Sequence, residues 1–296
     1  MKKIYVFALS CFLSAPVIAE DIDRSLDAAA DGYVEISNIS GSVTVSGWSK
    51  KQVEVTGTLG RNVEELIFER DGDEITIKVK IPRNNGHSHG RGYDSDLYIK
   101  VPKNSSIDVG TVSADIEVTE VAGDQGLSSV SGDVTTESSG ANTRAESVSG
   151  DVDIEGNNAD GETSASTVSG DVTLSRIAGE VSAETVSGDI DIDAVSFKRA
   201  EFGTVTGDID FRAGLDKGGR LEVETVNGSV DIEFVGDVSA RFDIDTFNGE
   251  IRNCYGPKAE RTSKYAPGWE LEFTTGNGDG RVDISTLNGD VSICSD

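Results

Sequence analysis

The stretch TVSGDVTLSRIAGEVSAE, residues 167–184, contains the same nine-residue pattern twice in succession. Each unit has a glycine near its middle, Gly170 or Gly179, and apolar or small residues lie at even distances from it. Polar residues fill the odd distances, and alternation with a period of two is typical of a β-strand that buries one face. An α-helix does not bring residues at this spacing to one side. We therefore interpret the stretch as short strands, two of which make one coil.

The first half of this unit recurs through the C-terminal two thirds of the chain, with a glycine, or once an alanine, as its marker. The markers are Ala114, Gly132, Gly150, Gly170, Gly188, Gly207, Gly228, Gly249 and Gly289. Up to Gly249 they lie 18 to 21 residues apart, and self-similarity at such a period is the signature of a solenoid. We predict an all-β fold, a parallel β-solenoid of about nine two-strand coils.

Coils that stack in register place equivalent side chains in columns. Two positions before each marker stands Val, Phe or Leu, and counting from the glycine places this apolar column on the buried face. The columns one and three positions before the marker carry Ser, Thr or Asn, and the same counting places both on the outward face. We expect them either to form hydrogen-bonded ladders or to offer a flat polar face to a sugar or another regular polymer.

Two parts of the chain depart from the repeat. Residues 20–108 contain strand patterns without a fixed spacing, which we interpret as an N-terminal β region that caps the open edge of the solenoid. Residues 109–296 form the repeat solenoid, with an inserted loop at 255–278. After this loop the pattern resumes in register, because GRVDISTLNG (280–289) matches GRLEVETVNG (219–228). We predict a single elongated domain.

We interpret residues 1–19 as a secretory signal peptide. Lys2 and Lys3 precede an uncharged apolar run that ends in small residues at Ala19, the pattern that signal peptidase recognises. The run is too short to span a bilayer comfortably. A lipoprotein signal with Cys11 as the lipidation site is the alternative. In either case the mature protein is expected to be exported.

The charge of the chain limits its partners. It carries 53 acidic and 26 basic residues, a formal net charge of −27. Such a field repels phosphate backbones and anionic lipid head groups, so we expect no nucleic-acid partner. Solubility outside the cytoplasm explains an acidic surface, and cation binding is the sharper alternative.

Aspartates recur directly after the marker on the outward face, at Asp133, Asp151, Asp171, Asp189 and Asp208. We interpret them as solvated turn residues. Calcium bridging is the alternative, because stacked carboxylates about 5 Å apart repel one another and calcium prefers oxygen ligands. Apart from this option, the sequence predicts no cofactor.

The only two histidines, His87 and His89, lie in the glycine-rich segment RNNGHSHGRGYDSD (83–96). A His-x-His pair can chelate a transition metal, but the sequence identifies no third ligand. We interpret the segment as a solvated loop. A Ser-His-Asp or Cys-His enzyme would have to use it, and no nucleophile motif accompanies it.

Cys254 and Cys294 each follow their marker glycine by five residues, so we expect them on adjacent coils about 4.8 Å apart. That spacing falls within the range of a disulfide, and an exported protein meets an oxidising environment. Once Cys11 is removed with the signal peptide, these two cysteines remain as one pair. We predict a disulfide that ties down the C-terminal edge, with two unpaired thiols as the alternative.

A carbohydrate-active β-helix enzyme is a second function class, because parallel β-helices often host lyases and hydrolases. Such sites usually pair carboxylates with basic or aromatic side chains in a groove. The basic residues of the repeats are expected to be scattered rather than aligned. They are Arg144, Arg176, Lys198, Arg199, Arg212, Lys217, Arg220, Arg241 and Arg252.

Four motifs follow one another in a distinctive order: NISGSVTVSGW (38–48), YIKVP (98–102), the serial TVSGDV repeats, and GNGDGRVDISTLNGDVSI (276–293). In this order the chain resembles a family of exported bacterial β-strand-repeat proteins of unknown function that are often labelled "putative adhesins". The resemblance spans roughly residues 32–294. It implies a β-solenoid and export, and it implies no catalytic residues.

We therefore expect a non-enzymatic interaction or adhesion module of the bacterial envelope that presents flat polar ladders. The periplasm is the expected compartment, with the cell surface and secretion as alternatives. The partner is expected to be a protein or glycan of the envelope. The competing hypotheses are the carbohydrate-active enzyme and a calcium-stabilised structural rod.

Overall fold

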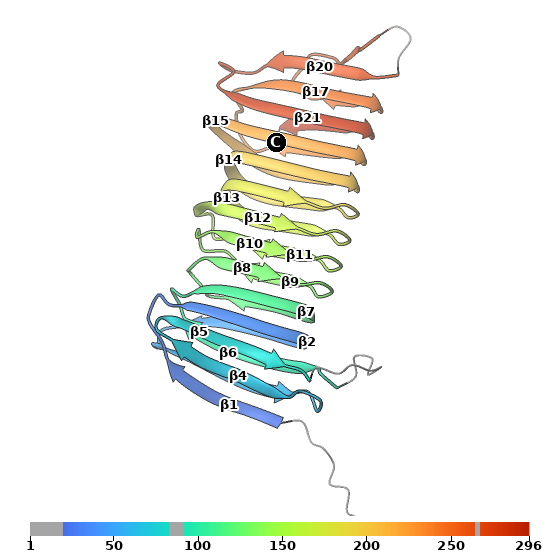
Figure 1. Cartoon of the computed structure of the whole chain (residues 1–296). Coiled ribbons are helices and arrows are strands. Elements are labelled where there is room, and N and C mark those ends of the chain that lie inside the picture. Colours follow the sequence, from blue (N-terminus) through green and yellow to red (C-terminus); the bar gives the residue numbers. More distant parts are fainter. Residues whose placement is uncertain (1–19, 83–91, 264–266, 296) are drawn as a thin grey trace, which may run out of the picture.

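The computed structural model describes residues 20–82, 92–263 and 267–295. Every regular element among these residues is a β-strand, and the strands stack along one axis (Figure 1). The all-β prediction is confirmed. Because the described residues form no helix, none of them supplies a helical membrane span. The proposed signal peptide with Cys11, and both histidines, lie outside the described residues.

The middle of the molecule is a regular parallel stack. Its strands are β7 (Ser106–Thr119), β8 (Gln125–Ser128), β9 (Val134–Glu137), β10 (Thr143–Glu146), β11 (Val152–Glu155), β12 (Asp160–Ser166), β13 (Val172–Glu184), β14 (Ile190–Thr206), β15 (Ile209–Asn227) and β16 (Val230–Phe234). Each coil places one strand on a first face, with β8, β10 and β12, and one on a second face, with β9 and β11. Equivalent residues are direct partners, since Val152 pairs with Val134 on one side and Val172 on the other.

The core lies between the two faces and grows towards the C-terminal end. In the middle coils it consists of small and branched side chains such as Ala145, Ala165 and Ile154. In the later coils phenylalanines take over, and Phe211 contacts both Phe197 and Phe234 with ring centroids 5.6 and 5.9 Å apart. Alternation of buried with more exposed residues within the strands produces this core, as the period of two predicts.

The N-terminal end has strands of mixed orientation. It contains β1 (Glu20–Asp27), β2 (Tyr33–Trp48), β3 (Gln52–Leu59), β4 (Glu65–Asp71), β5 (Glu74–Lys80) and β6 (Ser95–Pro102). Strand β2 runs parallel to β7 on one side and to β5 and β6 on the other. The pairs β1–β3, β3–β6 and β4–β5 are antiparallel. The domain division at residue 108, the capping role and the number of coils stay predictions.

The C-terminal end does not follow the order of the sequence. Its strands are β17 (Ala240–Asn248), β18 (Ile251–Asn253), β19 (Glu260–Arg261), β20 (Trp269–Thr274), β21 (Gly280–Asn288) and β22 (Val291–Ser295). Strand β21 lies between β15 and β17 (Figure 1), and β22 pairs with both β16 and β18. The last coil of the sequence is therefore inserted between two earlier ones.

The segment expected as an inserted loop contains two strands of its own. Strand β20 pairs antiparallel with β17, and β19 pairs antiparallel with β20 (Figure 1). The chain thus passes over the end of the stack before it returns to form β21. A similar arrangement exists at the other end, where β2 lies between the coil of β5 and β6 and the coil of β7. Strand β2 and the last coil of the sequence are therefore interior, whereas β1 lies at the edge of the stack (Figure 1).

Candidate functional site

The corner at each marker glycine, where the chain passes from the first face to the second, differs from the prediction. Ala165 and Thr167 are buried on the first face, and Val172 and Leu174 are buried on the second. Val168, which was expected inside, is 45% exposed, and Thr167, which was expected outside, is 5% exposed. The residue three positions before the marker continues the alternation of the preceding strand. A new alternation starts only after the marker glycine. Counting backwards through the turn therefore gave the wrong side for both columns.

The hydroxyl column three positions before the marker is a structural ladder rather than an outward face. Its buried members are Thr111, Ser129, Ser147, Thr167, Thr185, Thr204, Thr225, Thr246 and Thr286. Thr167 Oγ1 donates to the Gly150 carbonyl oxygen at 2.9 Å, and Thr185 Oγ1 donates to that of Gly170 at 3.1 Å. Bonds of this kind connect most coils to the marker glycine of a neighbouring coil. Of the two predicted roles this column therefore has only the hydrogen-bonding one.

The marker glycines stack too closely for a Cβ, whereas the first marker, Ala114, carries one. A Cβ at Gly188 would lie 1.9 Å from the Gly170 carbonyl oxygen, and one at Gly170 would lie 2.2 Å from that of Gly150. The recurring glycine is therefore required by the approach of successive backbones.

The aspartate column directly after the marker also connects neighbouring coils. The Asp171 amide donates to Asp151 Oδ1 at 2.9 Å, and the Asp189 amide donates to Asp171 Oδ1 at 2.8 Å. Asp133 and Asp208 take part in the same chain of contacts. One oxygen of each carboxylate thus satisfies a backbone donor of the next coil. Among the described residues no group of three or more His, Cys, Asp or Glu side chains is arranged to hold a metal ion.

The exposed apolar column two positions before the marker is the most distinctive surface of the molecule. We call it the apolar ladder; in stacking order it comprises Val112, Val130, Val148, Val168, Val186, Val205, Val226, Leu287 and Phe247. Its members are between 39% and 49% exposed. At about 4.8 Å per coil, the ladder runs for about 38 Å along the solenoid. The sequence contains a signal for this surface, because Thr167 is in phase with the buried Ala165 and Val168 is not, but counting from the glycine obscures it.

At its C-terminal half the apolar ladder lines a groove of about 810 Å³, and we call the apolar part of the lining its floor and the acidic part its wall. The floor comprises Val186, Val205, Val226, Leu287 and Phe247. Five carboxylates, from Glu184, Glu201, Glu222, Glu224 and Asp245, line the groove, and no Lys or Arg does. Burial, together with the charges of Asp243 and Glu270, raises the pKa of Asp245. The groove therefore has an apolar floor and a negatively charged wall.

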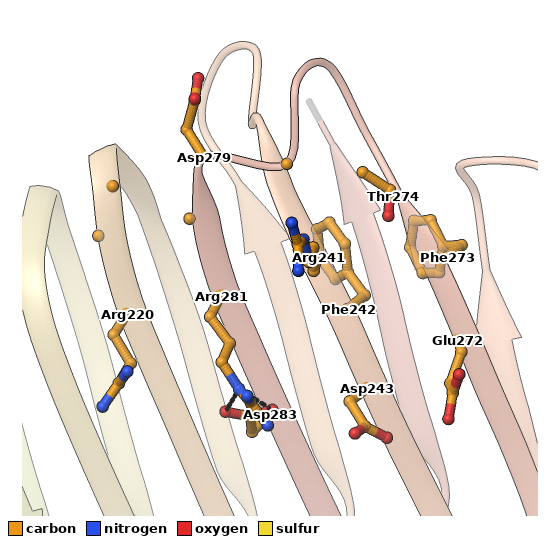
Figure 2. Close-up of a pocket in the computed structure, with 14 residues that line it drawn as sticks. Arg220, Arg241, Phe242, Asp243, Glu272, Phe273, Thr274, Asp279, Arg281 and Asp283 are labelled. Atoms are coloured by element: carbon orange, nitrogen blue, oxygen red, sulfur yellow. Dashed lines mark hydrogen bonds and ion pairs between the residues drawn. The ribbon is translucent and has the colours of Figure 1, made fainter.

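A second groove of about 640 Å³ lies on the first face at the C-terminal end (Figure 2). Arg220 of β15, Arg281 of β21 and Arg241 of β17 stand on neighbouring strands in register, and Arg199 pairs with Arg220. The expectation that the arginines of the repeats are scattered is therefore wrong for Arg199, Arg220 and Arg241. Arg199 and Arg220 are direct partners, and the inserted coil places Arg281 between Arg220 and Arg241.

Carboxylates stand beside this arginine column. Arg281 Nε donates to Asp283 Oδ2 at 2.6 Å, and the hydrogen bond and charge of Asp283 raise the pKa of Arg281. Asp243 is the neighbour of Asp283 on one side, and Glu222 is its neighbour on the other. The groove thus has a positive column next to a negative one, an arrangement in which each column compensates the other.

Cys254 and Cys294 lie side by side after β18 and in β22. Their Cα atoms are 4.9 Å apart and their sulfurs are at bonding distance, 2.00 Å. The Cys254 amide donates to the Ile293 carbonyl oxygen at 3.0 Å. A disulfide at this position attaches β18 to the inserted coil.

These features define a class of protein, an all-β repeat protein whose side-chain columns connect its coils and leave one apolar column exposed. Residues 33–294 match the family model described as Toastrack DUF4097, and the chain belongs to this family. No curated protein sequence matches it.

Several solved structures are similar over most of the chain. A "putative adhesin" from Bacteroides fragilis is 10% identical, with a TM-score of 0.45, and the match covers 94% of this chain and 97% of that one. A "putative lipid binding protein" from Parabacteroides distasonis is 15% identical, with a TM-score of 0.38 and coverage of 93% and 96%. A "putative cell adhesion protein" from Clostridium sporogenes is 9% identical, with a TM-score of 0.27 and coverage of 94% and 100%.

Proposed function

We propose that the protein is a non-enzymatic interaction module of the bacterial envelope and that the apolar ladder is its binding surface. The observation that carries the proposal is the exposure of nine aligned apolar side chains in register. Contiguous exposed apolar patches on soluble proteins often mark interaction sites. Exposed Ser, Thr and Asn side chains one position before the marker border the ladder and supply hydrogen-bonding groups at its rim.

The side chains of the apolar ladder themselves support binding rather than turnover. Val, Leu and Phe side chains supply neither a nucleophile nor a proton donor or acceptor. Desolvation of the ladder is the favourable contribution, at about 25 cal/mol for each Å² of apolar surface that a partner covers. The carboxylates at the groove wall then restrict which partners fit.

Export belongs to the same proposal. The N-terminal charge, the apolar run and the small residues before Glu20 support a signal peptide that directs the chain to the periplasm. Cell fractionation followed by N-terminal sequencing tests this step. A mature chain that starts at Glu20 in the periplasmic fraction is the expected result, and an intact Met1 in the cytoplasm would contradict it.

The binding test compares two variants of the mature chain with the wild type. The ladder variant replaces Val168, Val186, Val205 and Val226 by Thr, which keeps the shape and adds polarity. The control variant replaces Val195 and Val235 by Thr; they are 58% and 40% exposed and lie away from the ladder. Retention of each protein on washed bacterial envelopes is measured, together with any oligosaccharide released.

We expect the ladder variant to lose at least about tenfold in retention, which corresponds to about 1.4 kcal/mol, and the control variant to behave as wild type. Equal melting temperatures of the variants confirm that the fold is intact. Unchanged retention of the ladder variant would overturn the proposed surface. Release of cleaved oligosaccharide would overturn the proposal that the module is not an enzyme.

A further inference from the structure

We infer that the partner of the apolar ladder is a cationic amphipathic α-helix that lies along the groove between Val186 and Phe247. This inference rests on the proposed function and specifies the chemistry of the partner. Three observations support it. The ladder side chains have a spacing close to the pitch of a helix, carboxylates lie on both sides of the ladder, and these charges disfavour other partners.

The spacing of the ladder fits a helix better than a strand. Successive ladder side chains are about 4.8 Å apart, and an α-helix with an apolar stripe presents one turn every 5.4 Å or so. The mismatch of about 0.6 Å per turn stays below half a turn over roughly four turns, which is the length of the groove floor. An extended strand presents the same face about every 6.7 Å, so it falls out of step after about two coils.

Negative charge borders the ladder on both sides. The groove wall on the first face carries Glu184, Glu222 and Glu224, and the groove contains no basic side chain. On the other side lies the aspartate column, where Asp189 and Asp208 each use one oxygen for a backbone amide. A helix with Lys or Arg on both flanks of an apolar face places a cation over each row of carboxylates.

The environment of Asp245 is consistent with such a partner. Its pKa is raised by burial and by the carboxylates of Asp243 and Glu270, so its own surroundings leave its negative charge poorly compensated. A cation delivered by a bound helix would reverse that effect.

The same charges exclude other occupants. Two copies of this chain that met through their ladders would oppose identical rows of carboxylates, and each chain carries a net charge of −27. Anionic lipid surfaces and nucleic acids are repelled for the same reason. An uncharged apolar helix would cover the carboxylates without compensating them, which is costly.

The experiment uses a synthetic peptide of about 14 residues with a Leu face flanked by Lys, long enough to cover the groove. A scrambled peptide of the same composition and a peptide with Glu in place of Lys are the comparison ligands. Affinity for the mature chain is measured by calorimetry at low and high salt, and peptide helicity by circular dichroism. The protein variants are Val186→Thr with Val205→Thr and Val226→Thr, and Glu184→Gln with Glu222→Gln and Glu224→Gln.

We expect only the Leu/Lys peptide to bind, with gain of helicity and with an affinity that falls as salt rises. The Val-to-Thr variant should weaken binding at least about tenfold at either salt concentration, and the Glu-to-Gln variant should reduce the salt dependence measurably. The Val195→Thr, Val235→Thr control should bind as wild type. Binding that is equal for the scrambled peptide, or unaffected by either variant, would overturn the inference.

The outcome separates this inference from the proposed function. If no peptide binds while the ladder variant still loses retention on envelopes, the helix is the wrong partner class and the ladder remains the binding surface. If the Val-to-Thr substitutions change neither peptide binding nor retention on envelopes, both the inference and the proposed surface are wrong.

Discussion

The marker glycines lie where the backbones of successive coils approach closely. This close approach limits which residues can replace the glycine. A Cβ at Gly188 would lie 1.9 Å from the Gly170 carbonyl oxygen, whereas one at Gly203 would meet only the Glu224 carbonyl oxygen, at 3.9 Å. We predict that Gly188→Ala lowers the free energy of unfolding by about 3 kcal/mol, because the coils must move apart. Gly203→Ala is the control and should be close to neutral. Urea titration of both variants measures the difference, and equal stabilities would contradict the close stacking.

The buried hydroxyl column allows a second comparison between two threonines in equivalent places. Thr185 Oγ1 donates to the Gly170 carbonyl oxygen at 3.1 Å, whereas the buried Thr225 Oγ1 has no hydrogen-bond partner among the described residues. Thr185→Val should therefore cost about 1 kcal/mol, and Thr225→Val should be neutral or stabilising. Thermal unfolding of the two variants provides the measurement. A larger loss for Thr225→Val than for Thr185→Val would contradict the hydrogen-bond assignment.

The sequence predicted the buried side chains within strands correctly but not those at the corner. Val172 and Leu174 alternate with polar residues and are buried, as a period of two requires. Between Thr167 and Val172 the chain turns from one face to the other, and alternation does not continue through a turn. Propensity gives no warning either, because a valine at an exposed corner resembles a valine in a strand.

At the scale of strands, the inserted C-terminal coil is the main difference between sequence order and spatial order. Strand β21 separates β15 from β17, and β22 separates β16 from β18. The sequence contained a signal, because 280–289 matches 219–228 position for position, and these segments are neighbours. Similar coils stack well, with Asn288 Nδ2 donating to Asn227 Oδ1 at 2.8 Å. Periodicity alone does not indicate which of several similar coils are adjacent.

The position of the inserted coil predicts which strands are destabilised when the C-terminal residues are removed. A mature chain that ends at Asp279 lacks β21 and β22, so β17 and β18 lose the neighbours that connect them to the stack. We expect residues 240–274 to lose their protection from hydrogen exchange, while residues 125–206 keep theirs. Hydrogen–deuterium exchange with mass spectrometry measures both regions. Full protection of β17 in the truncated chain would show that the coils stack in sequence order.

At the scale of the whole molecule, uncompensated carboxylates oppose folding at neutral pH. Burial, reinforced by neighbouring carboxylates, raises the pKa values of Asp108, Asp153, Asp210 and Asp245 above the ordinary aspartate value of 3.8. A raised pKa means that the folded state binds the proton more tightly than the unfolded state does. These groups therefore destabilise the fold above their folded pKa values, and the penalty disappears as the pH falls towards 3.8.

We predict that the melting temperature rises as the pH is lowered from 7 to about 4.5, and that added salt at pH 7 has a similar effect. Asp153→Asn combined with Asp210→Asn should raise the melting temperature at pH 7 and flatten its dependence on pH. Calorimetric scans across this range make the measurement. A melting temperature that falls steadily on acidification would show that favourable carboxylate contacts dominate instead.

The proposed binding surface and its proposed partner both depend on the exposure of the apolar ladder. Thiol labelling tests this exposure most directly. Val205 and Thr204 are adjacent, yet Val205 is exposed and Thr204 is buried. In a mature chain whose other two cysteines are bonded, Val205→Cys should react with a maleimide as fast as an exposed thiol. Thr204→Cys should react at least about a hundredfold more slowly, because it must wait for the corner to open. Equal rates, or faster labelling of Thr204→Cys, would contradict the account.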